Sequence, residues 1–163
     1  MNELLENIVG ILRREFADAV HDVSEFRGDV TVLVQRDRIA DITRFLRDLP
    51  DCPFNLIEDV CGVDRLERKE RFEVVYHLFS LEKKARIRLK VRVDEAELRV
   101  PTVTGVFPGA NWHERETYDM YGIVFDGHPD MRRVYMPEDY EHFPMRKDFP
   151  LLGIPGSIKL PRQ

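Results

Sequence analysis

Carboxylates, a basic residue and large aromatic residues crowd into one short segment, residues 111–121. Glu114, Arg115, Glu116 and Asp119 all lie in it, and paired carboxylates can act as general acid and base when their environments separate their pKa values. The same groups also serve as helix caps, dipole partners and ion pairs on the surface of a helix. Of these two interpretations we favour the structural one.

Potential metal ligands are present, but not at the spacing of a known site. The run His113-Glu114-Arg115-Glu116 is not the His-Glu-x-x-His arrangement that puts two ligands on one helical face. His128 and His142 stand apart among prolines. The two cysteines, Cys52 and Cys61, are too few for a zinc or iron–sulfur site built from protein ligands, and Cys61 is expected to be a small buried hydrophobic residue in a strand. The sequence therefore predicts no metal site.

Other motifs and the overall charge exclude further classes. Gly-x-Gly-x-x-Gly, Gly-Lys-Ser/Thr and Gly-x-Ser-x-Gly are all missing, which argues against nucleotide binding and a serine nucleophile. With 25 basic and 30 acidic residues among 163, the chain lacks the basic excess of a nucleic-acid-binding protein. Its N-terminus has no secretion signal, and no stretch approaches the roughly 20 apolar residues that span a bilayer. We expect a cytosolic domain that reaches a membrane only through a partner.

Apolar spacing predicts the elements that must position these side chains. A helix is predicted over about residues 2–16, and a second one follows Asp37, which can cap it, and stops at Pro50. Strands are predicted over residues 20–26, 30–34, 54–63, 72–81 and 85–93. The turn Arg27-Gly28-Asp29 joins the first two strands; a hairpin is favoured over an integrin-binding tripeptide because a secretion signal is lacking. This order lacks regular βαβ alternation, so the predicted fold class is α+β, a mixed or antiparallel sheet with helices on one face.

The strand at 85–93 alternates apolar residues with Arg86, Arg88, Lys90 and Arg92. A period of two puts the four cations on the face opposite the core. A solvated sheet face is the favoured explanation, and a partner-docking face is the alternative.

Residues 101–163 hold eight of the ten prolines and six of the nine glycines. One short helix is predicted there, with Asn111 as its N-cap, Glu114 as the capping-box partner and Gly122 at its end. Arg115 and Asp119 are four residues apart and are expected to pair on its surface. Aromatic residues alternate with carboxylates all round this helix, so we expect it to be buried on several sides, partly against another chain.

The segment after this helix carries an apolar residue every few positions between prolines. Disordered tails are poor in such residues, and prolines prevent long helices and central strands. We therefore expect an extended docking arm that lies over a partner, with prolines lowering its ordering entropy and Arg146, Lys147 and Asp148 as charged anchors. The predicted division is a core domain over 1–100, a connecting segment with the helix over 101–124, and the arm over 125–163.

These residues resemble those of one known family, the C-type subunit of the bacterial respiratory NADH–quinone oxidoreductase (complex I). That family carries a Glu-Arg-Glu triplet, an acidic residue and two apolar residues, then a spaced histidine, a basic residue and an apolar pair. The matching residues here are Glu114-Arg115-Glu116, Asp119, Met120-Tyr121, His128, Arg132 and Val134-Tyr135. The segment from Leu56 to Asp64 and the run from Arg146 to Leu151 are also similar to the family.

The resemblance implies a non-catalytic, cofactor-free subunit that supports assembly in the peripheral arm of a proton-translocating enzyme. It would lie beside the quinone-reducing module, packed on the D-type subunit and close to cluster-bearing subunits. FMN, iron–sulfur clusters, NADH and quinone would belong to the complete enzyme, on the cytoplasmic side of the inner (cell) membrane.

No catalytic, cofactor-binding or metal-binding residue is then expected on this chain. The candidates for partner docking are Trp112, Glu114, Arg115, Glu116, Asp119, His128, Arg132, Arg146, Lys147 and Asp148. One alternative is the equivalent subunit of a membrane-bound hydrogenase or of a quinone oxidoreductase with another electron donor. A stand-alone enzyme that uses the helix carboxylates is the alternative of a different class.

Overall fold

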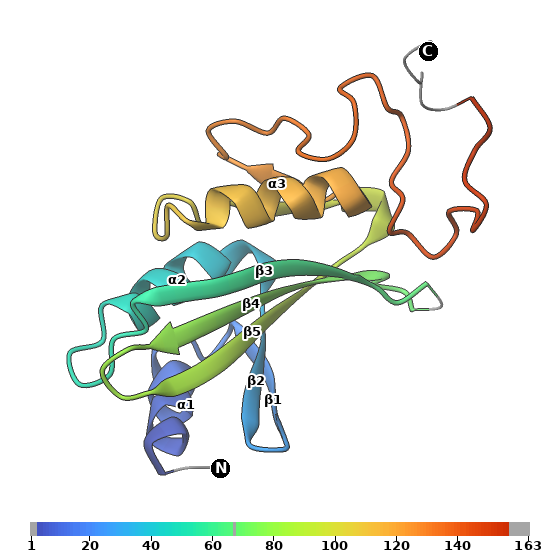
Figure 1. The fold of residues 1–163 in the computed structure, drawn as a ribbon. Coiled ribbons are helices and arrows are strands. Elements are labelled where there is room, and N and C mark those ends of the chain that lie inside the picture. Colours follow the sequence, from blue (N-terminus) through green and yellow to red (C-terminus); the bar gives the residue numbers. More distant parts are fainter. Residues whose placement is uncertain (1–2, 67, 157–163) are drawn as a thin grey trace.

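A five-stranded mixed sheet organises the computed structural model, which describes residues 3–66 and 68–156 (Figure 1). The strand order is β1-β2-β5-β4-β3, in which β2 and β5 are parallel and the other pairs are antiparallel. The strands are β1 (Val20–Phe26), β2 (Asp29–Val34), β3 (Leu56–Asp64), β4 (Phe72–Ser80) and β5 (Ala85–Val93). Their bounds lie within two residues of the predicted ones, and the predicted α+β class is confirmed.

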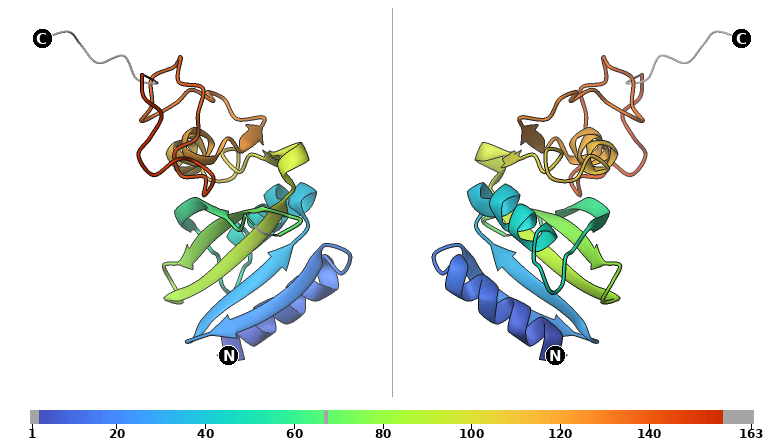
Figure 2. Two further views of the ribbon diagram at one scale, coloured as in Figure 1. Left: turned by 90° about the vertical axis from the view of Figure 1, so that its right-hand side faces the viewer. Right: turned by 90° about the vertical axis from the view of Figure 1, so that its left-hand side faces the viewer.

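Two helices, α1 (Glu3–Glu15) and α2 (Ile39–Arg47), cover one face of this sheet (Figure 2). Their apolar stripes join the sheet in one core, where Leu12 and Ile42 are fully buried. Asp37 was wrongly predicted to cap the second helix. It lies in a 3₁₀ turn, η1 (Arg36–Arg38), and no side chain caps α2.

The outer face of the sheet carries the four cations of β5, and each of them has an acidic neighbour. The closest contacts are Arg86–Glu58 at 2.5 Å, Arg88–Asp29 at 3.1 Å, Lys90–Glu73 at 3.5 Å and Arg92–Glu70 at 3.7 Å. The side chains on the other face of β5, such as Ile87, Leu89 and Val91, are fully buried, and each stabilises the fold by roughly 1.5–3 kcal/mol. Since the cations are neutralised within the sheet, the solvated-face interpretation is the better supported.

A second, smaller unit follows the turn η2 (Glu95–Glu97) at one end of the sheet (Figure 1). Strands β6 (Arg99–Pro101) and β7 (Val124–Asp126) pair in parallel, and helix α3 (Ala110–Tyr121) connects them. These two short strands were not predicted. Residues 127–156 form turns without helix or strand and pass over α3, and we call this segment the arm. In the part of the chain that is described, no helix has the length and apolarity to cross a membrane.

Candidate functional site

Helix α3 is seated on the edge strand β3 of the main sheet. The Thr117 hydroxyl donates to the Val60 carbonyl at 3.1 Å, and the Tyr121 ring lies against Gly62. A Cβ at Gly62 would come within 2.5 Å of that ring, so only glycine permits this close approach. The helix therefore occupies a position that the backbone of β3 provides.

The ends of α3 correct part of the predicted capping. The helix begins at Ala110 after Gly109, so Asn111 was wrongly predicted as its N-cap, and no side chain caps this end. Gly122 ends the helix as predicted, with a φ of 80° in the left-handed region that favours glycine.

Glu114 is fully buried and does not form the predicted capping box. Its carboxylate accepts hydrogen bonds from the Val103 amide at 2.7 Å and from the Thr102 hydroxyl, so it ties α3 to the loop after β6. Burial raises the pKa of Glu114 to about 7, although both hydrogen bonds act in the opposite direction.

The imidazole of His128 lies beside this carboxylate, with Nε2 at 3.9 Å from the nearer Glu114 oxygen. Its Nδ1 accepts from the Asp130 amide at 3.0 Å, which leaves Nε2 to donate to the Asn111 carbonyl at 3.2 Å. Burial lowers the pKa of His128, which favours this neutral form. Both side chains are shielded from solvent and bonded within the chain, as expected of structural groups.

Asp119 fastens the start of the arm to α3. One carboxylate oxygen accepts from the amides of Val134, Tyr135 and Met136 at 3.0, 2.7 and 3.0 Å. The other accepts from Arg133 at 2.6 Å. Burial opposes ionisation, but these donors outweigh it and hold the pKa of Asp119 below its usual range.

Arg115 therefore does not pair with Asp119, contrary to the prediction. Its guanidinium donates to the carbonyls of Arg132 and Arg133 at 2.9 and 3.2 Å, and it lies 4.9 Å from the centre of the Trp112 ring. The Arg132 side chain points outward and pairs with Asp130. Of the two adjacent arginines, Arg133 enters the buried pair with Asp119, and no local pattern distinguishes it from Arg132 in that role.

A second set of contacts fastens the arm near residues 146–148. Asp64, at the end of β3, accepts from Arg71 at 2.7 Å and from the Lys147 amide at 2.8 Å. Arg71 also pairs with Asp148 at 2.8 Å, and Arg146 donates to the Tyr121 carbonyl at 2.7 Å. The hydrogen bonds from Arg71 outweigh burial and hold the pKa of Asp64 well below its usual range. The predicted anchors at 146–148 are thus used within the chain, and their partners Asp64 and Arg71 were not predicted.

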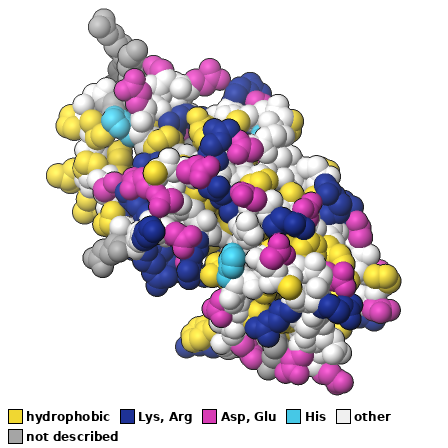
Figure 3. All heavy atoms as spheres, turned by 180° about the vertical axis from the view of Figure 1, so that it is seen from behind, with side chains coloured by type: hydrophobic (Ala, Val, Ile, Leu, Met, Phe, Trp, Pro, Cys, Tyr) yellow, Lys and Arg dark blue, Asp and Glu magenta, His cyan; other side chains and the backbone are white. Residues whose placement is uncertain are grey.

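Apolar side chains on α3 and the arm face outward. Five of them are more than half exposed, and in Figure 3 hydrophobic side chains gather on the side where the arm lies. They are Trp112 (63%), Tyr135 (61%), Met145 (55%), Leu151 (102%) and Leu152 (98%). On α3 the polar residues Glu114, Thr117 and Asp119 are buried while Trp112 is exposed, the reverse of an ordinary surface helix.

The remaining candidates divide between surface and interior. Glu116 is exposed on α3, and the helix carboxylates do not converge on an enclosed cavity: Glu116 lines a shallow surface pocket, whereas Glu114 is buried. Cys61 was wrongly predicted to be buried. It is half-buried, and burial, with Asp59 nearby, raises the pKa of its thiol to about 11, so it is a neutral thiol.

The fold and the inverted polarity of α3 define the class: a domain built to sit against other protein. Comparison with known proteins makes this specific, because residues 32–154 match the family described as respiratory-chain NADH dehydrogenase, 30 Kd subunit. The chain therefore belongs to that family.

Individual relatives agree. The chain is 56% identical to the C-type subunit of NADH-quinone oxidoreductase from Roseiflexus sp. (strain RS-1), over 86% of this chain and 80% of that protein. It is 51% identical to the C-type subunit numbered 2 from Rhizobium meliloti (strain 1021), over 88% and 78%.

Solved structures give the same fold. A trypsin-resistant fragment of Nqo5 is similar with a TM-score of 0.68 and 34% identity, over 77% of this chain and 98% of that one. A chain of an archaeal membrane-bound sulfane sulfur reductase is similar with a TM-score of 0.75 and 29% identity, over 92% and 88%.

Proposed function

We propose that this chain is a scaffold subunit in the peripheral arm of a proton-translocating NADH–quinone oxidoreductase. In this role it holds no flavin, iron–sulfur cluster or NADH site of its own. It supports assembly beside the quinone-reducing module, on the cytoplasmic side of the cell membrane, with the D-type subunit and neighbouring cluster-bearing subunits as partners. Family membership and the names of the relatives support this assignment.

One structural observation carries the docking part of the proposal: polar groups of α3 and the arm point inward and apolar ones point outward. Glu114 and Asp119 have hydrogen-bond partners inside the chain, so they leave no unsatisfied charge on the surface. Trp112, Leu151 and Leu152 stay exposed at 63%, 102% and 98%. Exposed apolar side chains that cluster in this way are typical of a surface that another protein covers.

Purification from membranes tests this proposal. The tagged full chain, extracted in mild detergent, is expected to bring with it the flavin- and cluster-bearing subunits of the NADH module, identified by mass spectrometry. Replacing both Leu151 and Leu152 by Ala, or Trp112 by Ala, should lower the recovery of these partners at least tenfold, because central apolar anchors carry most of the binding energy.

The matched control is Phe26→Ala, which removes a side chain that is 70% exposed at the β1–β2 turn, in the main sheet rather than in α3 or the arm. It should leave recovery unchanged. Recovery of a monomeric chain without partners, with Glu116→Gln abolishing turnover of a small molecule, would contradict the scaffold role and favour the stand-alone enzyme.

The sulfane sulfur reductase likeness keeps one related assignment open to the same experiment. If a nickel–iron large subunit or another donor module were recovered instead of the NADH module, the chain would be the equivalent subunit of a different respiratory complex. The identities of 56% and 51% to NADH-quinone oxidoreductase subunits favour the NADH assignment over the 29% likeness.

A further inference from the structure

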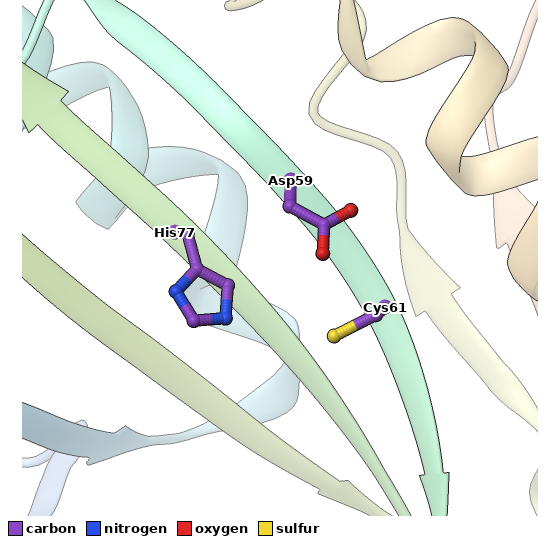
Figure 4. A group of neighbouring side chains, drawn as sticks. All are labelled: Asp59, Cys61 and His77. Carbon is purple, nitrogen blue, oxygen red and sulfur yellow. The ribbon is translucent and has the colours of Figure 1, made fainter.

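Three side chains with different ligand atoms meet on the outer face of the main sheet (Figure 4). Asp59 and Cys61 are two residues apart on β3, so they point to the same face, and His77 on β4 is the register partner of Asp59. A carboxylate oxygen, the thiol sulfur and an imidazole nitrogen all lie within 4.8 Å of one another. All three residues are half-buried, so a small ion can reach them from solvent.

We propose that Asp59, Cys61 and His77 form a site for a divalent transition metal, with Zn²⁺ as the best match. Zinc accepts this mixture of thiolate sulfur, imidazole nitrogen and carboxylate oxygen, at bond lengths of about 2.0–2.3 Å. In a tetrahedron of that size the ligand atoms stand roughly 3.5 Å apart. Side-chain rotations that bring the three atoms about 1 Å closer therefore complete the site, and water takes the fourth position.

His113 extends the site to helix α3. Its Nδ1 lies 3.2 Å from the Asp59 carboxylate. Such a neighbour orients a ligating carboxylate, as outer-shell hydrogen bonds do in metal sites. A metal bound here would link β3 and β4 directly and would link both strands to α3 through His113.

The charges around the site permit a divalent ion. Metal binding converts the Cys61 thiol to a thiolate and releases its proton to solvent, so Asp59 and Cys61 together supply two negative charges. Arg88 and Lys90 lie close enough to act on the Cys61 thiol, but each is paired elsewhere, with Asp29 at 3.1 Å and with Glu73 at 3.5 Å.

The sequence concealed this site because its members come from three elements. His77 is sixteen residues from Cys61, and His113 follows much later, so no short motif joins them. Pairing of β3 with β4 and the seating of α3 on β3 bring them together.

Metal titration of the full chain, after treatment with a chelator, tests the proposal. We expect one Zn²⁺ per chain, and with Co²⁺ as a spectroscopic probe we expect a thiolate-to-metal charge-transfer absorption that Zn²⁺ abolishes. Cys61→Ser and His77→Gln should remove both signals. Cys52→Ala is the matched control, because Cys52 is buried in the core and belongs to no such group among the described residues.

The variants also need to be folded for the result to count, so each is melted in the presence of chelator, where it should match the wild type within a few degrees. His113→Gln should weaken Zn²⁺ binding about 10- to 100-fold and keep the Co²⁺ absorption, as an outer-shell change does. An unchanged affinity in His113→Gln would remove His113 from the site. Absence of stoichiometric Zn²⁺ binding, or full binding by folded Cys61→Ser, would overturn the proposal.

Discussion

Asp119→Asn is the sharpest test of how the arm is held on α3. The substitution keeps the size of the side chain but replaces one of the two acceptor oxygens by an NH₂ donor and removes the charge. Asp119 is fully buried, and its two oxygens serve different donors: one takes three backbone amides, and the other takes Arg133.

Neither orientation of an asparagine can satisfy both sets of donors. If its oxygen faces the amides of residues 134–136, its NH₂ faces the buried Arg133 guanidinium, and in the flipped orientation the amides lose their acceptor. Removing one partner of a buried charge pair costs about 3–5 kcal/mol. We take the lower end, about 3 kcal/mol, since Arg133 keeps its contacts with the carbonyls of Asp119 and His142. That free energy corresponds to a roughly 100-fold rise in local opening.

Hydrogen exchange at single-residue resolution measures this opening. The amides of Val134, Tyr135 and Met136 should exchange about 100-fold faster in Asp119→Asn, while the amides of β4 and β5 keep their protection. Asp130→Asn is the matched control, because Asp130 lies on the same arm but pairs with the exposed Arg132 side chain, and its exchange pattern should match the wild type. Unchanged protection at these three amides in Asp119→Asn would refute the argument that this carboxylate holds the arm.

Three further predictions concern pH and packing. Glu114→Gln should flatten the pH dependence of stability: the folded-state pKa of about 7 lies above the unfolded value near 4.3, so the wild type should lose up to about 3 kcal/mol as pH rises between those values, measured by urea unfolding at pH 5 and pH 8, and an equal slope in both proteins would count against it. The pKa values of Asp64, Asp119 and Asp148 are lowered, so their stabilisation is present above about pH 4 and is lost as the pH falls through the folded-state values; fluorescence of the single Trp112 should report release of the arm before the sheet unfolds, and one coincident transition would speak against separate release. Gly62→Ala should destabilise the chain by about 1–3 kcal/mol in denaturant unfolding because its Cβ meets the Tyr121 ring, whereas Gly10→Ala in α1, where nothing lies within 4 Å, should be neutral or slightly stabilising; equal effects would reject the close-approach argument.

The main domain was predictable because its signals are local. Alternation over residues 85–93 and helical spacing in the first sixteen residues report burial directly, since each side chain either faces the core or does not. The cap at Asp37 failed because a 3₁₀ turn precedes α2 and moves the helix start. Strands β6 and β7 escaped prediction because three residues are too few to show a period.

The site was only partly predictable, since its contacts join residues distant in sequence. The sequence identified Glu114, Arg115 and Asp119 as important but assigned them local partners within the helix. Their actual partners are distant: Val103 for Glu114, Arg132 and Arg133 for Arg115, and residues 133–136 for Asp119. Helical spacing describes only neighbours on the same helix, so it cannot reveal an acceptor that a later loop provides.

This difference separates two sets of residues that the sequence treated as one. The motif residues Glu114, Arg115 and Asp119 are bonded inside the chain, so substituting them changes the partner surface indirectly, by loosening the arm. Trp112, Leu151 and Leu152 are exposed, so substituting them acts on a partner directly and leaves the isolated chain folded. The two mechanisms differ in a measurable way: Asp119→Asn should accelerate exchange in the arm of the isolated chain, whereas the Leu151 and Leu152 substitutions should lower partner recovery with exchange in α3 and residues 133–136 unchanged. If both kinds of variant loosened the arm equally, the motif and the docking surface would be one structural unit.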